Sequence, residues 1–309
     1  MPDRVAFVGP LDRVLYLRTL PTFERLGPPE LGAIAQHARE RSFRRGAVLL
    51  DPARPVETAY VVIDGQVTIA RGDGLPGTAG PSDAVGILEL LARQPGGLSA
   101  VAATDTLTLE LDWEAQVGVC EDYFTILQQY LRVLALRFIH EMRRLPVDSR
   151  LGRATAEHHA GTRNLDLVQR LIAVAHARAF SDCNLDALVE LARHAQERTL
   201  AVGEILWRQR DPATHFALLT AGSLACTTGA NGWRLFAGPA FTVGLHEALA
   251  GIPRWFEAVA EIETTVLRLE VDPFLDLLED HFELAIDFTS AIARRVLELE
   301  AERRRAAGR

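Results

Sequence analysis

The chain has 309 residues, enough for two domains of ordinary size, and 48% of them are hydrophobic. Its formal charge is −8 at pH 7 and all 33 basic residues are arginine, so it lacks the basic balance of a general nucleic-acid binder. No uncharged apolar run approaches the roughly 18 residues of a membrane span, and the N-terminus does not resemble a signal peptide. The 3 cysteines, widely spaced, favour a reducing cytoplasm over a disulfide framework.

The first elements expected along the chain are helical, and short strands follow them. Leu31, Ile34 and Ala38 share one face of a helix. The segments GAVLL, TAYVVIDGQVTIA and TLTLELD have a two-residue apolar period between glycine and aspartate turns, which predicts strands. A long amphipathic helix over residues 121–144 closes this half of the chain.

Residues 147–164 separate the two halves of the chain. They are polar, contain glycine and show little periodicity, so we expect a linker between domains at 1–146 and 165–309. The linker contains the pair His158-His159, but no third metal ligand has a suitable spacing. We therefore expect a surface histidine pair and no metal site.

The second half of the chain repeats the first at an offset of 157 residues, which becomes 158 after a one-residue insertion. AIAQHARERSFRRGAVLL (33–50) aligns with ELARHAQERTLAVGEILW (190–207), and VGILELLARQPG (85–96) aligns with VGLHEALAGIPR (243–254). The same elements are thus predicted twice, with a hairpin turn at Asn231-Gly232 and a closing helix over 280–305 in the second copy. Short strands joined by tight glycine turns predict a small barrel or jelly roll.

Three glycines recur at equivalent positions of the two copies. Each copy has the same order of features, namely a helix, a strand pair, the motif y-v-v-x-x-G-x-v, the motif v-G-x-x-x-l-l, further strands and a long helix. This order resembles the cyclic nucleotide-binding domain family, which includes the catabolite activator protein and the regulatory subunits of cAMP-dependent protein kinase. The resemblance covers nearly the whole chain, twice over. It implies an α+β protein with two tandem β jelly-roll (double-stranded β-helix) domains, each flanked by N-terminal helices and a long C-terminal helix. The glycines are Gly46, Gly65 and Gly86, with Gly203, Gly222 and Gly244.

The resemblance also implies a phosphate-binding cassette, roughly F-G-E-x-A-L followed by P-R-A-A. In the family, backbone amides of a short helix and the arginine hold a cyclic phosphate, while the glutamate accepts a hydrogen bond from the ribose. The glutamate position holds Ile87 in the first copy and Leu245 in the second. Loss of that acceptor costs about 1.5–3 kcal/mol if the hydroxyl is buried without a partner.

The arginine position of the cassette differs between the two copies. It falls on Gly96 or Gly97 in the first copy, and on Arg254 or Trp255 in the second. The first copy therefore lacks both charged groups, and we expect it not to bind ordinary cAMP or cGMP. The second copy lacks the glutamate but retains a possible phosphate ligand.

These positions define a candidate ligand site in the second copy and an equivalent, non-functional set in the first. Arg254 is interpreted either as an anion ligand or as a solvated loop arginine. The candidate ligand site in the second copy comprises Gly244, Leu245, His246, Glu247, Arg254 and Trp255. The equivalent set in the first copy comprises Gly86, Ile87, Glu89 and Gly97.

Two further features of the cassettes have alternative interpretations. Glu89 and Glu247 are either relocated ribose acceptors or acids that complement a positive helix end. Trp255 and Phe256 either stack against a nucleobase or fill a space that would otherwise be empty. Trp233 at the predicted hairpin, if exposed, would indicate a protein partner.

The two long helices carry broad apolar stripes. The first has a stripe on one face that extends around the cylinder, and one barrel can cover only one face of a helix. We expect helices 121–144 and 280–305 to pair within one chain as a pseudo-dimer, with homodimerisation through the same helices as the alternative. The residues of the first stripe are Phe124, Leu127, Leu131, Leu134 and Phe138, and Ile126, Tyr130, Val133 and Leu136 extend it.

Two function hypotheses follow from the sequence. The first is a non-enzymatic bacterial regulatory protein, located in the cytoplasm, that senses a cyclic nucleotide, a cyclic dinucleotide or another anionic ligand through its second domain and signals to a partner protein. The second is a ligand-free scaffold in a larger assembly. We expect no cofactor and no membrane binding. We also expect no direct DNA binding, because few residues follow the second long helix and the linker is too short and polar to hold a helix-turn-helix. No catalytic triad, P-loop or helical zinc motif supports an enzyme.

Overall fold

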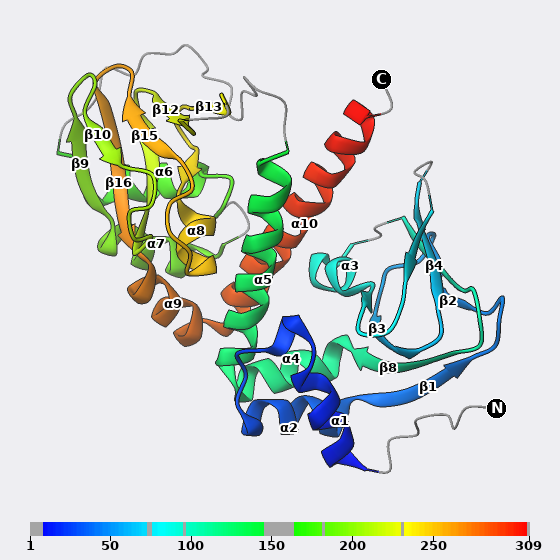
Figure 1. Ribbon diagram of the computed structural model, residues 1–309. Coiled ribbons are helices and arrows are strands. Elements are labelled where there is room, and N and C mark those ends of the chain that lie inside the picture. The colour runs from blue at the N-terminus through cyan, green and yellow to red at the C-terminus, as the bar shows by residue number, and fades with distance from the viewer. Residues whose placement is uncertain are drawn as a thin grey trace. The chain divides into compact units, whose positions relative to one another are not determined.

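The computed structural model describes residues 9–72, 76–94, 97–144, 164–180, 183–229 and 232–307 (Figure 1). The linker histidines, Gly96 and Asn231 lie outside these residues. The first copy contains α1 (Pro10–Arg18), η1 (Pro21–Phe23), α2 (Pro28–His37), β1 (Arg39–Phe43), β2 (Val48–Leu50), β3 (Thr58–Asp64), β4 (Val67–Arg71), β5 (Gly77–Ala79), β6 (Ala84–Val85), α3 (Ile87–Ala92), β7 (Leu98–Ala102), β8 (Thr106–Asp112), α4 (Trp113–Asp122) and α5 (Phe124–Met142).

The second copy repeats this order with few changes. It contains α6 (Leu167–His176), α7 (Leu185–His194), β9 (Gln196–Leu200), β10 (Ile205–Trp207), β11 (His215–Ala221), β12 (Leu224–Thr227), β13 (Arg234–Ala237), β14 (Thr242–Val243), α8 (Leu245–Ala250), β15 (Glu257–Ala260), β16 (Thr264–Glu270), α9 (Val271–Asp280) and α10 (Phe282–Ala307).

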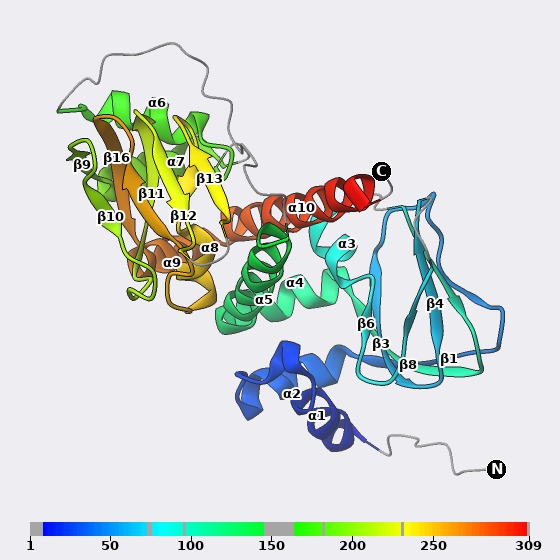
Figure 2. The same cartoon turned by 45° about the horizontal axis from the view of Figure 1, so that its top comes forward.

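Each copy builds a sandwich of two four-stranded antiparallel sheets. In the first copy the strand orders are β1-β8-β3-β6 and β2-β7-β4-β5, and in the second they are β9-β16-β11-β14 and β10-β15-β12-β13. Non-consecutive neighbours such as β3 and β8 require the chain to cross between sheets, as in a jelly roll. Figure 2 displays the strands of both sandwiches. The predicted fold class, two tandem jelly-roll domains with helices, is confirmed.

The helices begin where the local sequence favours a start. Asp112 and Asn184 accept hydrogen bonds from the third helical residue of α4 and α7, and Asp166 forms a complete capping box at α6. Prolines occupy the first positions of α1 and α2, where a missing N–H costs nothing. Capping side chains and N-terminal prolines thus mark the starts of these helices.

Each predicted long helix is interrupted near its start. The expected helices over 121–144 and 280–305 begin in the structure at Phe124 and Phe282, after a non-helical residue, Tyr123 (φ −135°, ψ 82°) or His281 (φ −123°, ψ 70°). The residues before the break belong to α4 and α9, whose last turns close with N–H groups of Tyr123 and His281 on the carbonyls of Val119 and Leu277. The break redirects the chain at the same position in both copies.

An aromatic cluster joins the helices of the second copy to its sandwich. Phe180 after α6, Phe216 on β11, Phe274 on α9 and Phe288 on α10 have ring centroids 5.2–6.2 Å apart. All four side chains are at most 3% exposed. Burial of each contributes about 1.5–3 kcal/mol to stability.

The polypeptide divides into two compact units that do not coincide with the sequence halves. Unit 1 contains residues 1–130 and 293–309, and unit 2 contains residues 131–292. Each unit therefore has one sandwich and parts of both long helices, α5 and α10. The predicted domain boundaries at 146 and 165 stay a prediction. In the part of the chain that the structure describes, no helix combines the length and apolarity that a membrane crossing requires.

Candidate functional site

The short helix α8 of the second copy begins at a glycine that no other residue replaces easily. Gly244 has φ +77° and is the N-cap of α8. A Cβ built on it would lie 2.8 Å from Cη2 of Trp207 and closer still to Nη1 of Arg254. Both the left-handed backbone and the close approach of these side chains therefore require glycine. Helix α8 lies beside α9 in both ribbon views (Figures 1 and 2).

Arg254 lies under this glycine and is almost completely buried, with 1% of its surface exposed. Its Nη1 donates to the carbonyl of Gly244 at 2.8 Å, and its Nη2 donates to the carbonyl of His215 at the start of β11. Its Cζ lies 4.1 Å from the ring centroid of Trp207, a cation–π contact. The interpretation as a solvated loop arginine is therefore wrong.

The charge of Arg254 lacks a close counterion. Within the described residues, no carboxylate lies within ion-pair distance of its guanidinium, and its Nε has no hydrogen-bond acceptor. Burial lowers the pKa of Arg254 to about 10, and the more distant charges of Glu247 and Asp211 partly offset this effect. The guanidinium thus remains charged at neutral pH.

Glu247, in the first turn of α8, points into the protein and is 3% exposed. Burial raises its pKa, while a hydrogen bond from its own backbone N–H and the charges of Arg254 and Arg143 act in the opposite direction. The Trp255 indole also favours the charged form, although its N–H makes no hydrogen bond of ordinary geometry. Glu247 is therefore a buried acid influenced by the charge of a buried arginine, and not a solvated acid at the end of a helix.

Helix α5 supplies side chains that contact α8 within unit 2. The ring of Phe138 stacks on His246 with centroids 3.5 Å apart and planes 5° from parallel. Nε of Arg132 donates to the carbonyl of Ala250, the last residue of α8, at 3.2 Å. The sequence placed Phe138 in an apolar stripe but gave no indication that this stripe reaches His246.

Aromatic side chains pack around Arg254. Trp233 and Trp255 have ring centroids 4.4 Å apart, Phe256 lies 5.2 Å from Trp255, and Trp207 lies 5.8 Å from Phe256. Arg143, which directly follows α5, lies over the Trp255 ring at 5.0 Å. These rings are at most 8% exposed, so Trp233 is not the exposed partner-binding residue that the hairpin position allowed.

Leu245, at the glutamate position of the cassette, is 1% exposed. It offers an apolar side chain where the resemblance implies a carboxylate. The second copy therefore has the cassette glycine, has Arg254 at one of the two positions that the alignment allows for the cassette arginine, and has an apolar side chain at the position of the ribose acceptor.

In the first copy, α3 occupies the place of α8. Gly86 is its N-cap with φ +85°, and the neighbours of a Cβ there would be Leu50 and Val56 rather than an arginine. Ile87 is half-buried, and Gly97 has φ +62° with open space around it. Ile87 and Gly97 themselves carry no charge, as the sequence shows, and the side chains nearest Gly86 are apolar.

Glu89 of α3 is fully buried and bound by an arginine that the sequence did not single out. Nε of Arg71, at the end of β4, donates to Oε1 of Glu89 at 2.7 Å, and Nη2 contacts the same oxygen. Nη1 of Arg71 donates to Oε2 of Glu300 on α10, also at 2.7 Å. Neither interpretation of Glu89, as a ribose acceptor or as a helix-end acid, included this pair.

Both copies match one family in sequence. The sequence profile described as "Cyclic nucleotide-binding domain" matches residues 40–123 and again residues 197–281, together more than half of the chain. The chain belongs to the cyclic nucleotide-binding domain family. The resemblance inferred from the glycines and the order of elements is thereby confirmed, and so is the tandem arrangement.

Individual relatives are similar over parts of the chain. A CRP-like cAMP-activated global transcriptional regulator from Mycobacterium tuberculosis is 29% identical over 120 residues, 37% of this chain and 54% of that protein. A cyclic nucleotide-gated potassium channel from Mesorhizobium japonicum is 30% identical over 92 residues, 30% of this chain and 25% of that protein. The chain thus spans about half the length of the first relative and a quarter of the second.

Among solved structures, the regulatory domain of Toxoplasma gondii PKA with cAMP is 16% identical, with a TM-score of 0.34 over 89% of this chain and 95% of that one. The N-terminal domain of a transcriptional regulator from Streptomyces coelicolor is 24% identical, with a TM-score of 0.37 over 40% of this chain and 91% of that one.

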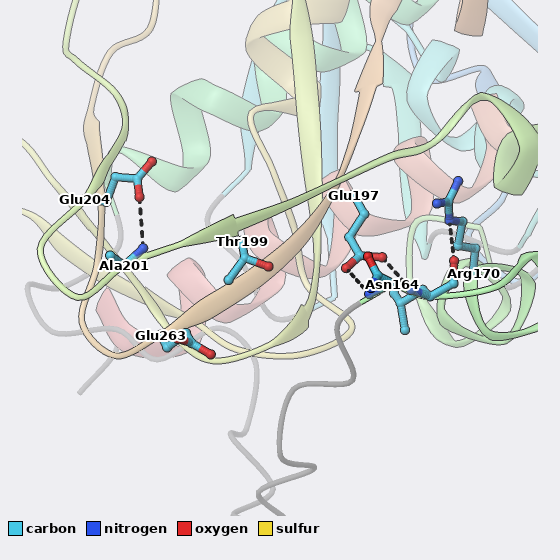
Figure 3. A pocket seen from close by; sticks show the side chains of 8 residues that line it. Asn164, Arg170, Glu197, Thr199, Ala201, Glu204 and Glu263 are labelled. Carbon is cyan, nitrogen blue, oxygen red and sulfur yellow. Dashed lines mark hydrogen bonds between the residues drawn. The ribbon is translucent and has the colours of Figure 1, made fainter.

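A polar groove in the second cyclic nucleotide-binding domain lies apart from the cassette (Figure 3). Its lining includes Glu197 and Glu204 of the β9 region, with Arg170 and Glu263. Glu197 accepts hydrogen bonds from the N–H groups of Asn164 and Leu165, and Glu204 accepts from Ala201 and Arg198, so both acids serve the local fold. In the described ranges, no group of three or more His, Cys, Asp or Glu side chains has the geometry to hold a metal ion.

Proposed function

We propose that the protein is a non-enzymatic regulator whose second domain binds an anionic, nucleotide-type ligand through Arg254 and passes the signal to a partner protein. Tandem cyclic nucleotide-binding domains support a regulatory, ligand-sensing role. The ligand, the residues that bind it and the partner are our proposals.

The observation that carries the proposal is the electrostatic state of Arg254. A buried cation that has only neutral carbonyl partners loses its hydration without gaining a countercharge. Its two Nη groups bind carbonyl oxygens of Gly244 and His215, and its Nε binds none among the described residues. A phosphate would supply the missing charge and accept from a planar guanidinium in two places at once.

The surrounding indoles favour a ligand that has both acceptor oxygens and an aromatic ring. The buried N–H groups of Trp207 and Trp233 make no hydrogen bond in the described structure, and that of Trp255, which acts on Glu247, makes none of ordinary geometry. Buried indole N–H groups in proteins usually find an acceptor, and indole faces stack on nucleobases. The first domain has Leu50 and Gly97 where the second has Trp207 and Trp255, so this donor set belongs to the second domain alone.

Leu245 restricts the ligand further. A ribose 2′-hydroxyl buried against Leu245 would lose its acceptor, at a cost of about 1.5–3 kcal/mol. We therefore propose weak binding of cAMP and cGMP, and leave a cyclic dinucleotide as the alternative ligand with the same phosphate chemistry.

A scaffold without a small ligand is the second candidate function. The observation that favours it is the close packing of Leu245, Trp233, Trp255 and Phe256, each below 9% exposure. On this view the aromatic rings have replaced the ligand, and the protein acts through its surface in a larger assembly.

The route of the signal is also a proposal. Phe138 and Arg132 of α5 contact His246 and Ala250 of α8, and Arg143, directly after α5, contacts Trp255. A ligand that moved the cassette would therefore move α5. Pairing of the long helices 121–144 and 280–305 within one chain, homodimerisation through them and the absence of direct DNA binding remain predictions. Light scattering distinguishes the first two, and a gel shift with salt-resistant sequence preference would contradict the third.

Isothermal calorimetry with the full chain tests the ligand proposal. We expect saturable binding of at least one of cAMP, cGMP, cyclic di-GMP and cyclic di-AMP, at least tenfold weaker in Arg254→Ala. Arg234→Ala is the matched control, because Arg234 is an exposed arginine of the same domain that lies over the ring of Phe236. Unchanged affinity in Arg254→Ala would remove this residue from the site, and no heat or thermal shift with any of the four ligands would favour the scaffold.

A further inference from the structure

The first domain contains a buried group of charges that the proposed ligand site does not use. Glu89 on α3 is 0% exposed and Glu300 on α10 is 4% exposed, and the side chain of Arg71 between them is 20% exposed. All three belong to unit 1, although Arg71 and Glu300 are separated by 229 residues in the sequence.

Arg71 connects two elements through different edges of its guanidinium. One edge, Nε and Nη2, faces Glu89, and Nη1 donates to Glu300 at 2.7 Å. Arg304, one turn further along α10, lies 3.7 Å from the same oxygen of Glu300. Two arginines and two carboxylates therefore balance one another in charge without any bound ion.

A second contact joins α10 to the other end of α3. Nη1 of Arg294 donates to the carbonyl of Ala92, the last residue of α3, at 3.3 Å. Helix α3 is thus held by α10 near its first turn through Arg71 and at its C-terminus through Arg294. Two contacts at opposite ends fix both the position and the direction of this helix.

The twin domain lacks this network. The residues equivalent to Arg71 and Glu300 are Thr228 and Met142, so Glu247 in α8 has no partner of the same kind. At the cassette arginine position the difference is reversed. The second domain has Arg254 there, and the first domain has glycine. In each domain an arginine acts on the buried acid of the short helix, Arg71 through an ion pair with Glu89 and Arg254 through its charge at a longer distance from Glu247.

We propose that the Arg71–Glu89–Glu300 network takes the place of a ligand in the first domain and fastens the C-terminal half of α10 to helix α3. In a ligand-dependent domain, an anion from solution completes the charges beside the short helix. In the first domain the protein provides both the cation, from β4, and the anion, from α10. This domain therefore holds α10 permanently, independent of any nucleotide.

Hydrogen–deuterium exchange of the full chain tests the network. We expect peptides that cover residues 293–304 to exchange at least tenfold faster in Arg71→Met, because removal of the arginine leaves Glu89 as a buried charge without its cation and leaves Glu300 with only the longer contact to Arg304. Amides of β3 and β8 should keep their protection, since the sheet hydrogen bonds do not involve this side chain. Glu300→Gln, which keeps the shape of the side chain, should increase exchange of the same peptides and serves if Arg71→Met does not fold.

Arg295→Met is the matched control on the same helix. Among the described residues, Arg295 forms ion pairs only within α10, with Glu298 at 2.7 Å and Glu302 at 3.6 Å. Its substitution should leave exchange at 293–304 within about twofold of the natural protein. Unchanged exchange in both Arg71→Met and Glu300→Gln would overturn the proposal, as would an equal increase in Arg295→Met. Millimolar cAMP should not alter exchange of α3, and a marked gain in its protection would mean that a ligand, not the network, holds the first domain.

Discussion

A methyl group at Gly244 tests whether the guanidinium of Arg254 occupies the place that the structure gives it. In Gly244→Ala the backbone keeps φ near +77°, a conformation that costs an L-residue about 1–2 kcal/mol. The new Cβ also meets Trp207 at 2.8 Å and the Arg254 guanidinium at a shorter distance. Arg254 cannot swing away freely, because it is buried and hydrogen-bonded to two carbonyls, so overpacking adds about 1–3 kcal/mol.

Gly203→Ala separates these two effects. Gly203 has φ +79°, and a Cβ there meets nothing within 4 Å. Both variants lose the same unfolded-state freedom of glycine and both strain a left-handed backbone. We expect Gly244→Ala to lose about 1–3 kcal/mol more unfolding free energy than Gly203→Ala.

Urea unfolding followed by tryptophan fluorescence measures this difference in the second domain. Trp207, Trp233 and Trp255 lie there, and Trp113 is the single tryptophan of the first copy. Equal losses in the two variants would refute the close packing of Arg254 and Trp207 beneath Gly244, and with it the reasoning that a ligand meets a fixed guanidinium.

Two further predictions concern titratable groups. Burial, followed by the charges of Arg268 and Arg254, lowers the pKa of His215 to about 4 from its ordinary value near 6.5, so the unfolded state binds the additional proton and stability falls as the pH decreases from 6.5 to 4. His215→Asn should remove this part of the acid destabilisation, seen as a smaller loss of Tm between pH 7 and pH 4, and parallel losses in both proteins would contradict the assignment. Burial raises the pKa values of Cys120, to about 12, and of Cys226, whereas Cys183 is partly exposed, so Ellman's reagent should modify one thiol quickly in the folded protein and three in urea. Fast reaction of all three without denaturant would mean that the two buried thiols are accessible.

The sequence was sufficient for the fold because the fold depends on local signals that occur twice. Gly46, Gly65 and Gly86 have positive φ in the structure, as do their twins in the second copy. The segment TLTLELD, read as a strand from its two-residue period, is β8 at the same residues. The breaks at Tyr123 and His281 were missed, since apolar residues continue at helical spacing on both sides and no glycine or proline marks the turn.

The candidate site was less accessible from sequence, because its contacts join distant residues. Arg254 was found through the cassette motif, but its burial and its bonds to two carbonyls depend on how Trp207 and His215 pack. Arg71 was missed entirely. One signal was available: Glu300 follows Val296 by four residues, so an acid lies on the apolar face of the second long helix and requires a buried partner. A single sequence does not say which of 33 arginines that partner is.

The difference between the two arginines decides how the two domains should respond to a ligand. Arg71 has carboxylates at 2.7 Å on both sides, so an anion that approached it would have to displace a protein carboxylate and would gain little. Arg254 has carbonyl oxygens and a tryptophan face as its direct contacts, and the more distant charges of Glu247 and Asp211 offset its charge only in part, so an anion in contact with it would gain more than one that approached Arg71. The duplication has therefore separated two properties that one ligand-binding domain combines. Under these proposals, the first copy provides the attachment of α10 to α3, and the second provides the anion site. Under the proposals above, a single ligand would bind the second domain and act through α5, while the end of α10 stays fixed on the first.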